Sequence, residues 1–351
     1  MVFRHLACGL VAAWFAWNSA AAETIVLQPD APERHVVVRG DTLWDISGKF
    51  LRDPWLWPEI WQVNPAIANP HLIYPGDTIL LSYDKDGRPV LSVQRGSDSA
   101  GGPTIKLSPS ARPQRVEESI PTIPLDAISQ FLTKAGVMSK TEYDALPYIV
   151  SFEDERMIAG ASDKAYVRGL SGESGDFAIV RLGEAYRNPG AKRDEILGYE
   201  VLEVGTVRIT RGGDPATGTV MQTSRELLRG DRLTPVTDTP LTTFTPRAAP
   251  GSVEGLIIAV VDGVSRIGVH HVVVLNVGEN EGIEPGHVFG VYQTGRVVDD
   301  PFAKKRGSEK VTLPDEQAGH VMVFRVFGRV SYALVTDAIR EIRIHDAVQK
   351  P

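Results

Sequence analysis

The second half of the chain repeats a pattern of residues, and this repeat constrains the fold more than any other feature. Short β-branched and aromatic runs alternate there with glycine and aspartate, which is typical of strands joined by turns. The run 175–181 has the same pattern as 286–292, and further positions recur at one offset of 115 residues. The first set is Gly218-Thr219-Val220, Arg225-Glu226, Asp231 and Leu233, and the second is Ala333-Leu334-Val335, Arg340-Glu341, Asp346 and Val348. We therefore predict two tandem β modules, 147–238 and 252–351, each a small barrel or sandwich.

A polar stretch without a core of its own precedes the two modules. Residues 84–124 are rich in Ser, Gly and Pro. Because such a stretch buries too little apolar surface to fold alone, we expect a flexible linker. Two short helices are expected over 125–146, the first ending at Gly136 and the second starting with a capping box formed by Ser139 and Glu142.

Ahead of the linker, residues 34–83 combine the signals of two strands and two helices. His35–Arg39 is short and β-branched, and a Gly-Asp turn separates it from an apolar pattern at helical spacing that starts at Thr42. Pro58 suits the first turn of a second helix. A Pro-Gly turn then leads into a closing strand, 78–82. The predicted order is strand, helix, helix, strand.

Both ends of this segment resemble the signatures of the lysin motif, or LysM, family. Residues 37–46 (VVRGDTLWDI) look like the opening signature, and Asn64-Pro65 with 72–79 (LIYPGDTI) look like the closing one. The resemblance implies a small α+β domain of βααβ fold that binds glycans containing N-acetylglucosamine, in bacteria chiefly peptidoglycan. We thus expect a multidomain chain with a LysM module, a linker and a mainly β C-terminal half that is not assigned to a known family.

The resemblance also implies where glycan binds. By position, the floor of the groove comes from the turn after the first strand and from the loop before the last one. The residues are Gly40, Asp41, Thr42 and Leu43 on one side, with Leu72, Ile73 and Tyr74 on the other. Turn backbone can hydrogen-bond an N-acetyl amide, and Leu and Ile side chains can seat its methyl group. Gly40, Leu43 and Ile73 could instead serve only the turn and the core.

All four tryptophans after residue 22 fall within one short stretch of the same segment. Trp44, Trp55, Trp57 and Trp61 lie in or beside the two predicted helices. A domain this small needs bulky residues to close its core, and Trp57 and Trp61 stand one helical turn apart. We expect core packing, although stacking of Trp55, Trp57 or Trp61 on a sugar ring stays open.

Residues 1–22 have the order of a secretory signal peptide: a basic residue, an apolar run and small residues before Glu23. The apolar run is short for a retained membrane anchor, the alternative, which needs about 20 residues. Cys8 is the sole cysteine, so the mature chain would hold no thiol, disulfide or thiolate metal site. We expect an exported protein of the periplasm or cell envelope, associated with the wall and without a membrane span after cleavage.

Charge and histidine placement argue against several chemistries. With 37 Lys and Arg against 44 Asp and Glu, the net charge of −7 disfavours nucleic acid as a partner. His270 and His271 are neighbours on a predicted strand, where they face opposite sides and cannot share a metal ion. His287, His320 and His345 show no ligand spacing. We expect no catalytic residue, no metal site and no cofactor.

These expectations lead to one function and two alternatives. The main hypothesis is a non-catalytic envelope protein that binds peptidoglycan or another N-acetylglucosamine glycan, while its β modules dock a protein partner or serve as structural units. The alternatives are a peptidoglycan hydrolase with an unrecognised catalytic domain and a structural component of a secretion or surface machine.

Overall fold

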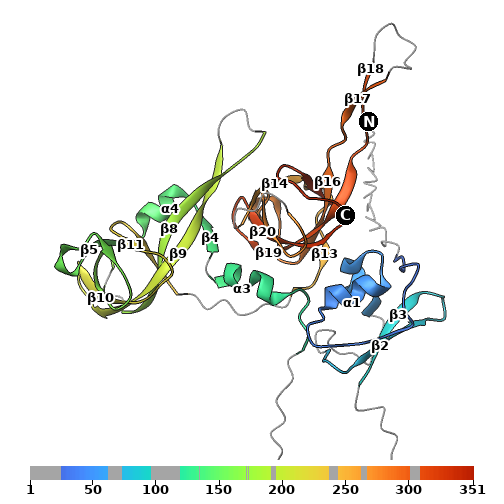
Figure 1. Ribbon diagram of the computed structural model, residues 1–351, viewed down its shortest axis with the longest axis horizontal. Helices are drawn as coiled ribbons and strands as arrows, with labels where there is room; N and C mark the ends of the chain where they lie inside the picture. Colours follow the sequence, from blue (N-terminus) through green and yellow to red (C-terminus); the bar gives the residue numbers. More distant parts are fainter. Residues whose placement is uncertain are drawn as a thin grey trace, which may run out of the picture.

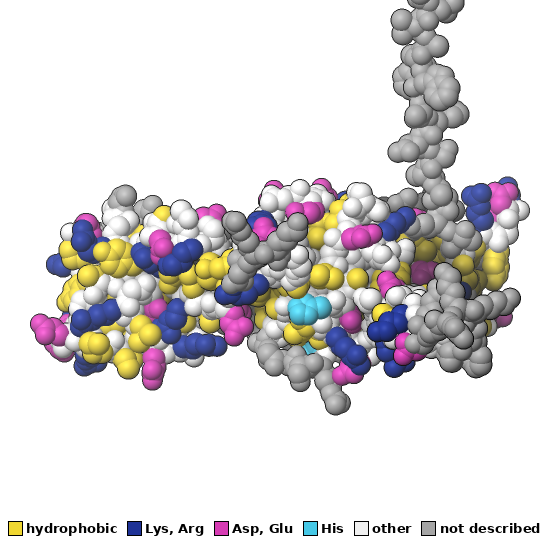
Figure 2. All heavy atoms as spheres, turned by 90° about the horizontal axis from the view of Figure 1, so that it is seen from above, with side chains coloured by type: hydrophobic (Ala, Val, Ile, Leu, Met, Phe, Trp, Pro, Cys, Tyr) yellow, Lys and Arg dark blue, Asp and Glu magenta, His cyan; other side chains and the backbone are white. Residues whose placement is uncertain are grey.

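A computed structural model describes residues 25–61, 73–95, 119–133, 135–170, 172, 174–190, 195–236, 244–261, 267–300 and 309–351. The predicted signal peptide, 1–22, lies outside the described residues. Figure 1 shows a small α/β domain at the N-terminal side and two β barrels, with helix α3 (Leu125–Thr133) between them. Seen from above, the three parts form a row, and charged side chains of both signs are interspersed over this face (Figure 2).

The N-terminal domain has the predicted order of strand, helix, helix and strand. Its antiparallel sheet has the order β1-β2-β3, so the closing strand β2 lies in the centre, next to the opening strand. The expected βααβ module is therefore confirmed. The elements are β1 (Arg34–Val36), α1 (Leu43–Phe50), the 3-10 turn η1 (Pro54–Leu56), α2 (Trp57–Trp61), β2 (Thr78–Tyr83) and β3 (Pro89–Gln94).

Helix α1 starts where its cap and its apolar spacing agree. The Thr42 hydroxyl accepts a hydrogen bond from the Asp45 amide at 3.1 Å. Buried residues then recur at helical spacing, with Leu43, Ile46 and Phe50 on the inner face. A helix of this length is marginal alone, so burial of that face in the apolar core provides most of its stability.

The four tryptophans close the core of this domain. Trp44, Trp55, Trp57 and Trp61 are at most 6% exposed. Trp57 and Trp61 meet edge to face, with ring centroids 6.5 Å apart. The structure thus places all four rings in the interior, as core packing requires.

Strand β3 differs from the sequence-based expectation, because it lies inside the stretch 84–124 that was expected to be linker. Its backbone pairs with β2 from Tyr83 and Pro89 to Thr78 and Gln94. Leu91 is fully buried. A hairpin whose inner residue reaches an existing core is stable even where its local composition is polar. Residues 96–118 of the predicted linker lie outside the described residues.

The first β module is a closed barrel. Its strands follow the order β10-β7-β5-β12-β8-β9, and pairing of β9 with β10 closes the ring, while β4 is added outside on β9. Helix α4 precedes the barrel and starts with the predicted capping box of Ser139 and Glu142. The predicted first helix, α3, ends at Thr133 and not at Gly136, because residues 135–138 form β4. The elements are β4 (Ala135–Met138), α4 (Lys140–Ala145), β5 (Tyr148–Phe152), η3 (Glu153–Glu155), β6 (Ile158–Ala159), β7 (Lys164–Arg168), β8 (Gly175–Arg187), β9 (Ile196–Arg211), β10 (Ala216–Thr223), β11 (Leu227–Leu228) and β12 (Arg232–Pro235).

The second β module closes in the same way. Its order is β16-β19-β20-β15-β14-β21, closed by pairing of β16 with β21, and β13 runs parallel to β16 outside the ring. The β17–β18 hairpin projects from it (Figure 1). The elements are β13 (Arg247–Ala248), β14 (Gly255–Val260), β15 (Val272–Leu275), η4 (Glu279–Glu281), β16 (His287–Gln293), β17 (Val297–Asp300), β18 (Glu309–Thr312), β19 (Glu316–Val326), β20 (Ser331–Ala338) and β21 (Ala347–Gln349).

The two barrels share one topology. When the ring strands of each barrel are numbered from one to six along the chain, both rings read 1-2-5-4-3-6 among the described residues. The repeated positions fall on equivalent elements: Gly218 on β10 corresponds to Ala333 on β20, and Leu233 on β12 to Val348 on β21. The predicted tandem repeat of small barrels is confirmed.

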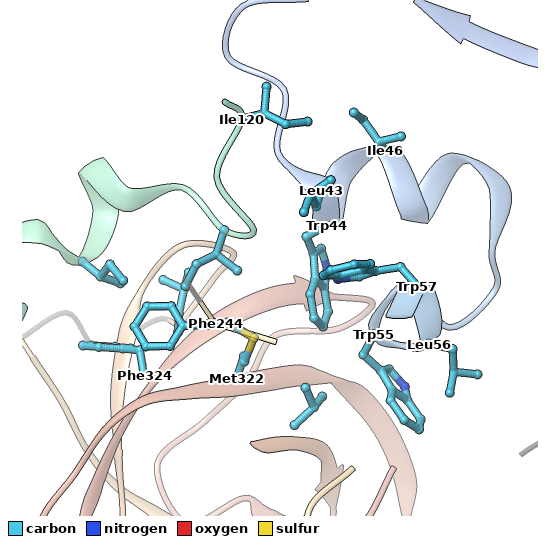
Figure 3. Packing of buried hydrophobic residues seen from close by; sticks show 14 of the residues in the cluster. Leu43, Trp44, Ile46, Trp55, Leu56, Trp57, Ile120, Phe244, Met322 and Phe324 are labelled. Carbon is cyan, nitrogen blue, oxygen red and sulfur yellow. The ribbon is translucent and has the colours of Figure 1, made fainter. Parts of the chain in front are cut away.

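The N-terminal domain packs against the second barrel. Trp44 and Trp55 share one buried cluster with Met322 and Phe324 of the barrel (Figure 3). Helix α3 joins the same cluster, and its Phe131 carbonyl accepts a hydrogen bond from the Arg325 guanidinium at 2.7 Å. The described domain and barrel therefore form a continuous apolar core instead of two separate bodies.

Candidate functional site

Two turns meet beside the start of α1 and make the frame of the predicted site. The first turn joins β1 to α1, and the second precedes β2. The Gly76 amide donates to the Val37 carbonyl at 2.8 Å, and the Val37 amide donates to the Asp77 carbonyl at 2.8 Å. The two turns that carry the predicted sides of the groove are thus held together by main-chain hydrogen bonds of neighbouring residues.

Asp41 holds the first turn in shape. Its carboxylate accepts hydrogen bonds from the Val38 amide at 3.0 Å and from His35 Nε2 at 2.8 Å, with Lys49 Nζ at 3.9 Å. Burial acts to raise the pKa of Asp41, but the hydrogen bonds from Val38 and His35 and the charge of Lys49 outweigh it and hold the pKa below its ordinary value. Asp41 is therefore anionic at neutral pH.

Gly40 takes the backbone position that this turn requires. Its φ of +99° lies in a backbone region that residues with a side chain rarely adopt. No atom lies within 4 Å of a Cβ placed at this position. Backbone conformation, and not lack of room, explains the glycine. The exposed main chain at Gly40 faces solvent beside the start of α1.

Asp77 plays the corresponding part in the second turn. Its carboxylate accepts a hydrogen bond from the Tyr74 amide at 3.1 Å. The same carboxylate forms an ion pair with the Arg95 guanidinium at 2.8 Å. The Arg95 guanidinium also lies 5.5 Å from the centroid of the Tyr74 ring. Arg95 was not among the predicted site residues, because it follows β3 in the expected linker and the sequence around it carries no local signal.

Two of the predicted residues contribute main chain and not side chain. The side chains of Leu43 and Ile73 are 1% and 0% exposed, so they belong to the core. The Leu43 amide and the Ile73 carbonyl, however, both point at a third segment of the chain: the Pro121 carbonyl accepts from Leu43 at 2.9 Å, and the Ile120 amide donates to Ile73 at 2.9 Å.

The structure thus brings the described members of the predicted set into two adjoining turns. Gly40 is exposed, Asp41 and Tyr74 are half-buried, and Thr42 is buried as the cap of α1. Leu72 lies outside the described residues. The third segment, 120–122, lies in the stretch that was expected to be a flexible linker, and it was not among the predicted site residues.

Comparison with protein families identifies the domain that carries this frame. A family model described as LysM domain matches residues 35–82. Residues 35–82 are a LysM domain. LysM domains bind N-acetylglucosamine glycans such as peptidoglycan and typically occur in proteins of the cell wall or envelope. No family model matches the C-terminal half.

A curated relative shares a stretch of similar length. Uncharacterized protein YqbP of Bacillus subtilis (strain 168) is 41% identical over 59 residues, which cover 14% of this chain and 27% of that protein. The chain therefore spans about a quarter of the length of the curated relative that it matches.

Two histidines, His271 and His320, make hydrogen bonds within the framework of the second barrel. His271 Nδ1 accepts a hydrogen bond from the Gly268 amide at 2.7 Å, and His320 lies between Asp337 and Gln317, both at 2.9 Å. Within the described ranges, no group of three His, Cys, Asp or Glu residues could hold a metal ion. The same ranges contain no helix with the length and apolar character to span a membrane.

Proposed function

We propose that this protein is exported to the bacterial envelope, where its LysM domain binds peptidoglycan or another N-acetylglucosamine glycan without cleaving it. In this proposal, Gly40, Asp41, Thr42 and Leu43 form one side of the site, and Leu72, Ile73 and Tyr74 the other. The two barrels dock a protein partner or act as structural units.

One observation supports the proposal for the LysM domain: the two turns present a main-chain donor and a main-chain acceptor to one short segment, Ile120-Pro121. The donor is the Leu43 amide and the acceptor is the Ile73 carbonyl. An N-acetyl group offers one carbonyl and one N–H, as a peptide does. The frame therefore offers one donor and one acceptor, and an N-acetyl group can use one of each.

The non-catalytic part of the proposal rests on the side chains available. The only cysteine is Cys8, which precedes the LysM domain. His271 and His320 are engaged in the hydrogen bonds of the second barrel. Incubation with intact peptidoglycan, with and without added zinc, should release no soluble muropeptides. Release that persists after removal of contaminating hydrolases would identify a hydrolase instead.

Binding is tested by sedimentation with purified peptidoglycan and by titration with soluble N-acetylglucosamine oligomers. We expect a Kd of about micromolar to millimolar, as for a shallow sugar site. Tyr74→Ala should weaken binding at least about tenfold, equivalent to ~1.4 kcal/mol. Tyr83→Ala is the matched control, because Tyr83 is 62% exposed at the end of β2. Equal loss in both variants would place the site elsewhere.

A further inference from the structure

A segment of the chain itself lies across the proposed glycan site. Ser119–Ile123, here called the strap, immediately precedes α3. The Ile120 amide donates to the Ile73 carbonyl at 2.9 Å, and the Pro121 and Thr122 carbonyls accept from the Leu43 and Trp44 amides at 2.9 and 3.1 Å. The strap therefore uses the donor and the acceptor that the proposed function assigns to the N-acetyl group.

These contacts complete the hydrogen bonding of the start of α1. The first amides of a helix have no partner within the helix. Here carbonyls of the strap accept hydrogen bonds from the first two amides, those of Leu43 and Trp44. The Thr42 hydroxyl accepts from the Asp45 amide, and the Thr42 carbonyl accepts from the Ile46 amide. With the strap in place, each of the first four amides of α1, from Leu43 to Ile46, already has a partner.

Apolar contacts hold the strap as well. Ile120 and Ile123 are 6% and 0% exposed and belong to the buried cluster of the LysM domain. Figure 3 shows Ile120 beside Leu43 and Ile46, at the start of α1. A fully buried isoleucine contributes about 1.5–3 kcal/mol relative to an exposed one, so the strap is a bound segment.

The strap is also kept at high local concentration. Helix α3 follows it directly, and Ile128 and Phe131 of that helix are buried in the cluster shared with the second barrel. A tethered segment competes at an effective concentration in the millimolar range. The strap occupies the site in most molecules where this concentration exceeds its own dissociation constant for the site.

We propose that the strap is an intramolecular competitor that closes the glycan site, so that glycan binds only after the strap leaves. This proposal rests on the proposed function of the LysM domain. A strap that is docked in nine of ten molecules lowers the apparent glycan affinity about tenfold, and one docked in 99 of 100 lowers it about 100-fold.

The test compares the full chain with Ile120→Ser, using a soluble N-acetylglucosamine oligomer as the probe. Loss of the apolar anchor should favour the open site and tighten binding at least about tenfold. The matched control is Ile344→Ser, because Ile344 is 44% exposed on the second barrel. The control should bind as the wild type does.

The other outcomes separate the two proposals. If Ile120→Ser and the wild type bind the oligomer equally, the strap does not compete, while the proposed glycan binding stands. If neither binds, glycan binding at this site fails, and competition by the strap fails with it.

A measurement on the wild type covers the case in which Ile120→Ser does not fold. Amide hydrogen exchange is followed with and without saturating oligomer or peptidoglycan fragments. Displacement predicts faster exchange at the Ile120 amide, while the Leu43 amide stays protected because the sugar replaces the strap as its partner. Bound glycan with unchanged exchange at Ile120 would overturn the proposal.

Discussion

The two barrels have the same framework, but one buried carboxylate has different side-chain partners in each. Asp231 in the first barrel and Asp346 in the second occupy equivalent positions, and each accepts a hydrogen bond from the main-chain amide three residues earlier, at 2.7 and 2.8 Å. The preceding residues, Gly230 and His345, both have positive φ. The turn is therefore conserved between the repeats down to its hydrogen bonds.

The difference lies in the side chain that faces the carboxylate. In the first barrel, Arg181 makes a two-pronged ion pair with Asp231, with both N–O distances 2.7 Å. In the second barrel, Gln293 takes the place of the arginine: it donates to the Glu341 carbonyl at 2.7 Å, as Arg181 donates to that of Glu226 at 2.9 Å.

The carboxyl of Asp346 in the second barrel has a raised pKa. Burial raises the pKa of Asp346 above its ordinary value of 3.8, and the hydrogen bonds from the Arg343 amide and the Gln293 side chain offset this only in part. A repeated turn can therefore keep its buried carboxylate and its main-chain hydrogen bonds, while the cationic side chain that pairs with that carboxylate is gained or lost.

The largest effect is expected for Arg181→Gln, which gives the first barrel the arrangement of the second. Asp231 is 3% exposed and would lose its counterion, which we expect to lower the free energy of unfolding by about 2–3 kcal/mol at pH 7. Urea denaturation measures this. Arg208→Gln is the control, because the ion pair of Arg208 with Asp176 is largely exposed, and its loss should change the free energy of unfolding far less.

The reverse exchange, Gln293→Arg, should have a smaller effect of opposite sign. A guanidinium beside Asp346 restores the missing counterion, and we expect a gain of about 1 kcal/mol at pH 7. The pKa of Asp346, followed by NMR, should fall. A loss of stability would show that the second barrel lacks room for the arginine geometry.

The third prediction concerns pH. Because the pKa of Asp346 is raised, the folded state binds the proton more tightly than the unfolded chain does. The contribution of Asp346 to the free energy of unfolding therefore falls as the pH rises from its ordinary pKa through the raised one. Asp346→Asn does not titrate, and its amide oxygen can still accept from Arg343. Between pH 3 and pH 7, the free energy of unfolding of the variant should therefore rise relative to that of the wild type, by about 1 kcal/mol or less. Urea denaturation at both pH values measures this difference, and a relative rise for the wild type would refute the prediction.

The smallest effect is expected at another repeated turn. Asp163 accepts from the Gly160 amide at 2.9 Å, and His271 accepts from the Gly268 amide at 2.7 Å. Since both side chains make the same hydrogen bond, His271→Asp should change the melting temperature little, corresponding to about 0.5 kcal/mol or less. A larger loss would give His271 a role beyond this turn.

The parts of the fold that depend on local chemistry were predictable from the sequence. The capping box at Ser139 and the repeated Asp231 and Asp346 each combine a turn residue with a short-range partner. Such signals need only a few neighbouring residues, and the structure confirms them.

The parts that depend on distant contacts were not predictable. The pairing of Ile120 with Ile73 joins residues far apart in sequence, and Ile120-Pro121 shows no periodicity that would indicate a partner. Packing of Trp44 near Met322 likewise follows from the shape of two assembled domains. For the same reason, the sequence pointed to the turns of the candidate site but gave no sign that another segment lies across them.

The closed ring order of the barrels bears on how such a chain can lengthen. In each barrel the first and last strands are neighbours: Tyr148 pairs with Arg232, and Gly255 pairs with Val348. The chain therefore enters and leaves each barrel on adjacent strands, as in domains that tolerate insertion into another chain. A copy of the whole unit can be inserted in series without threading a strand through an existing sheet. Gene duplication could thus extend the molecule by whole barrels and increase the distance that it spans.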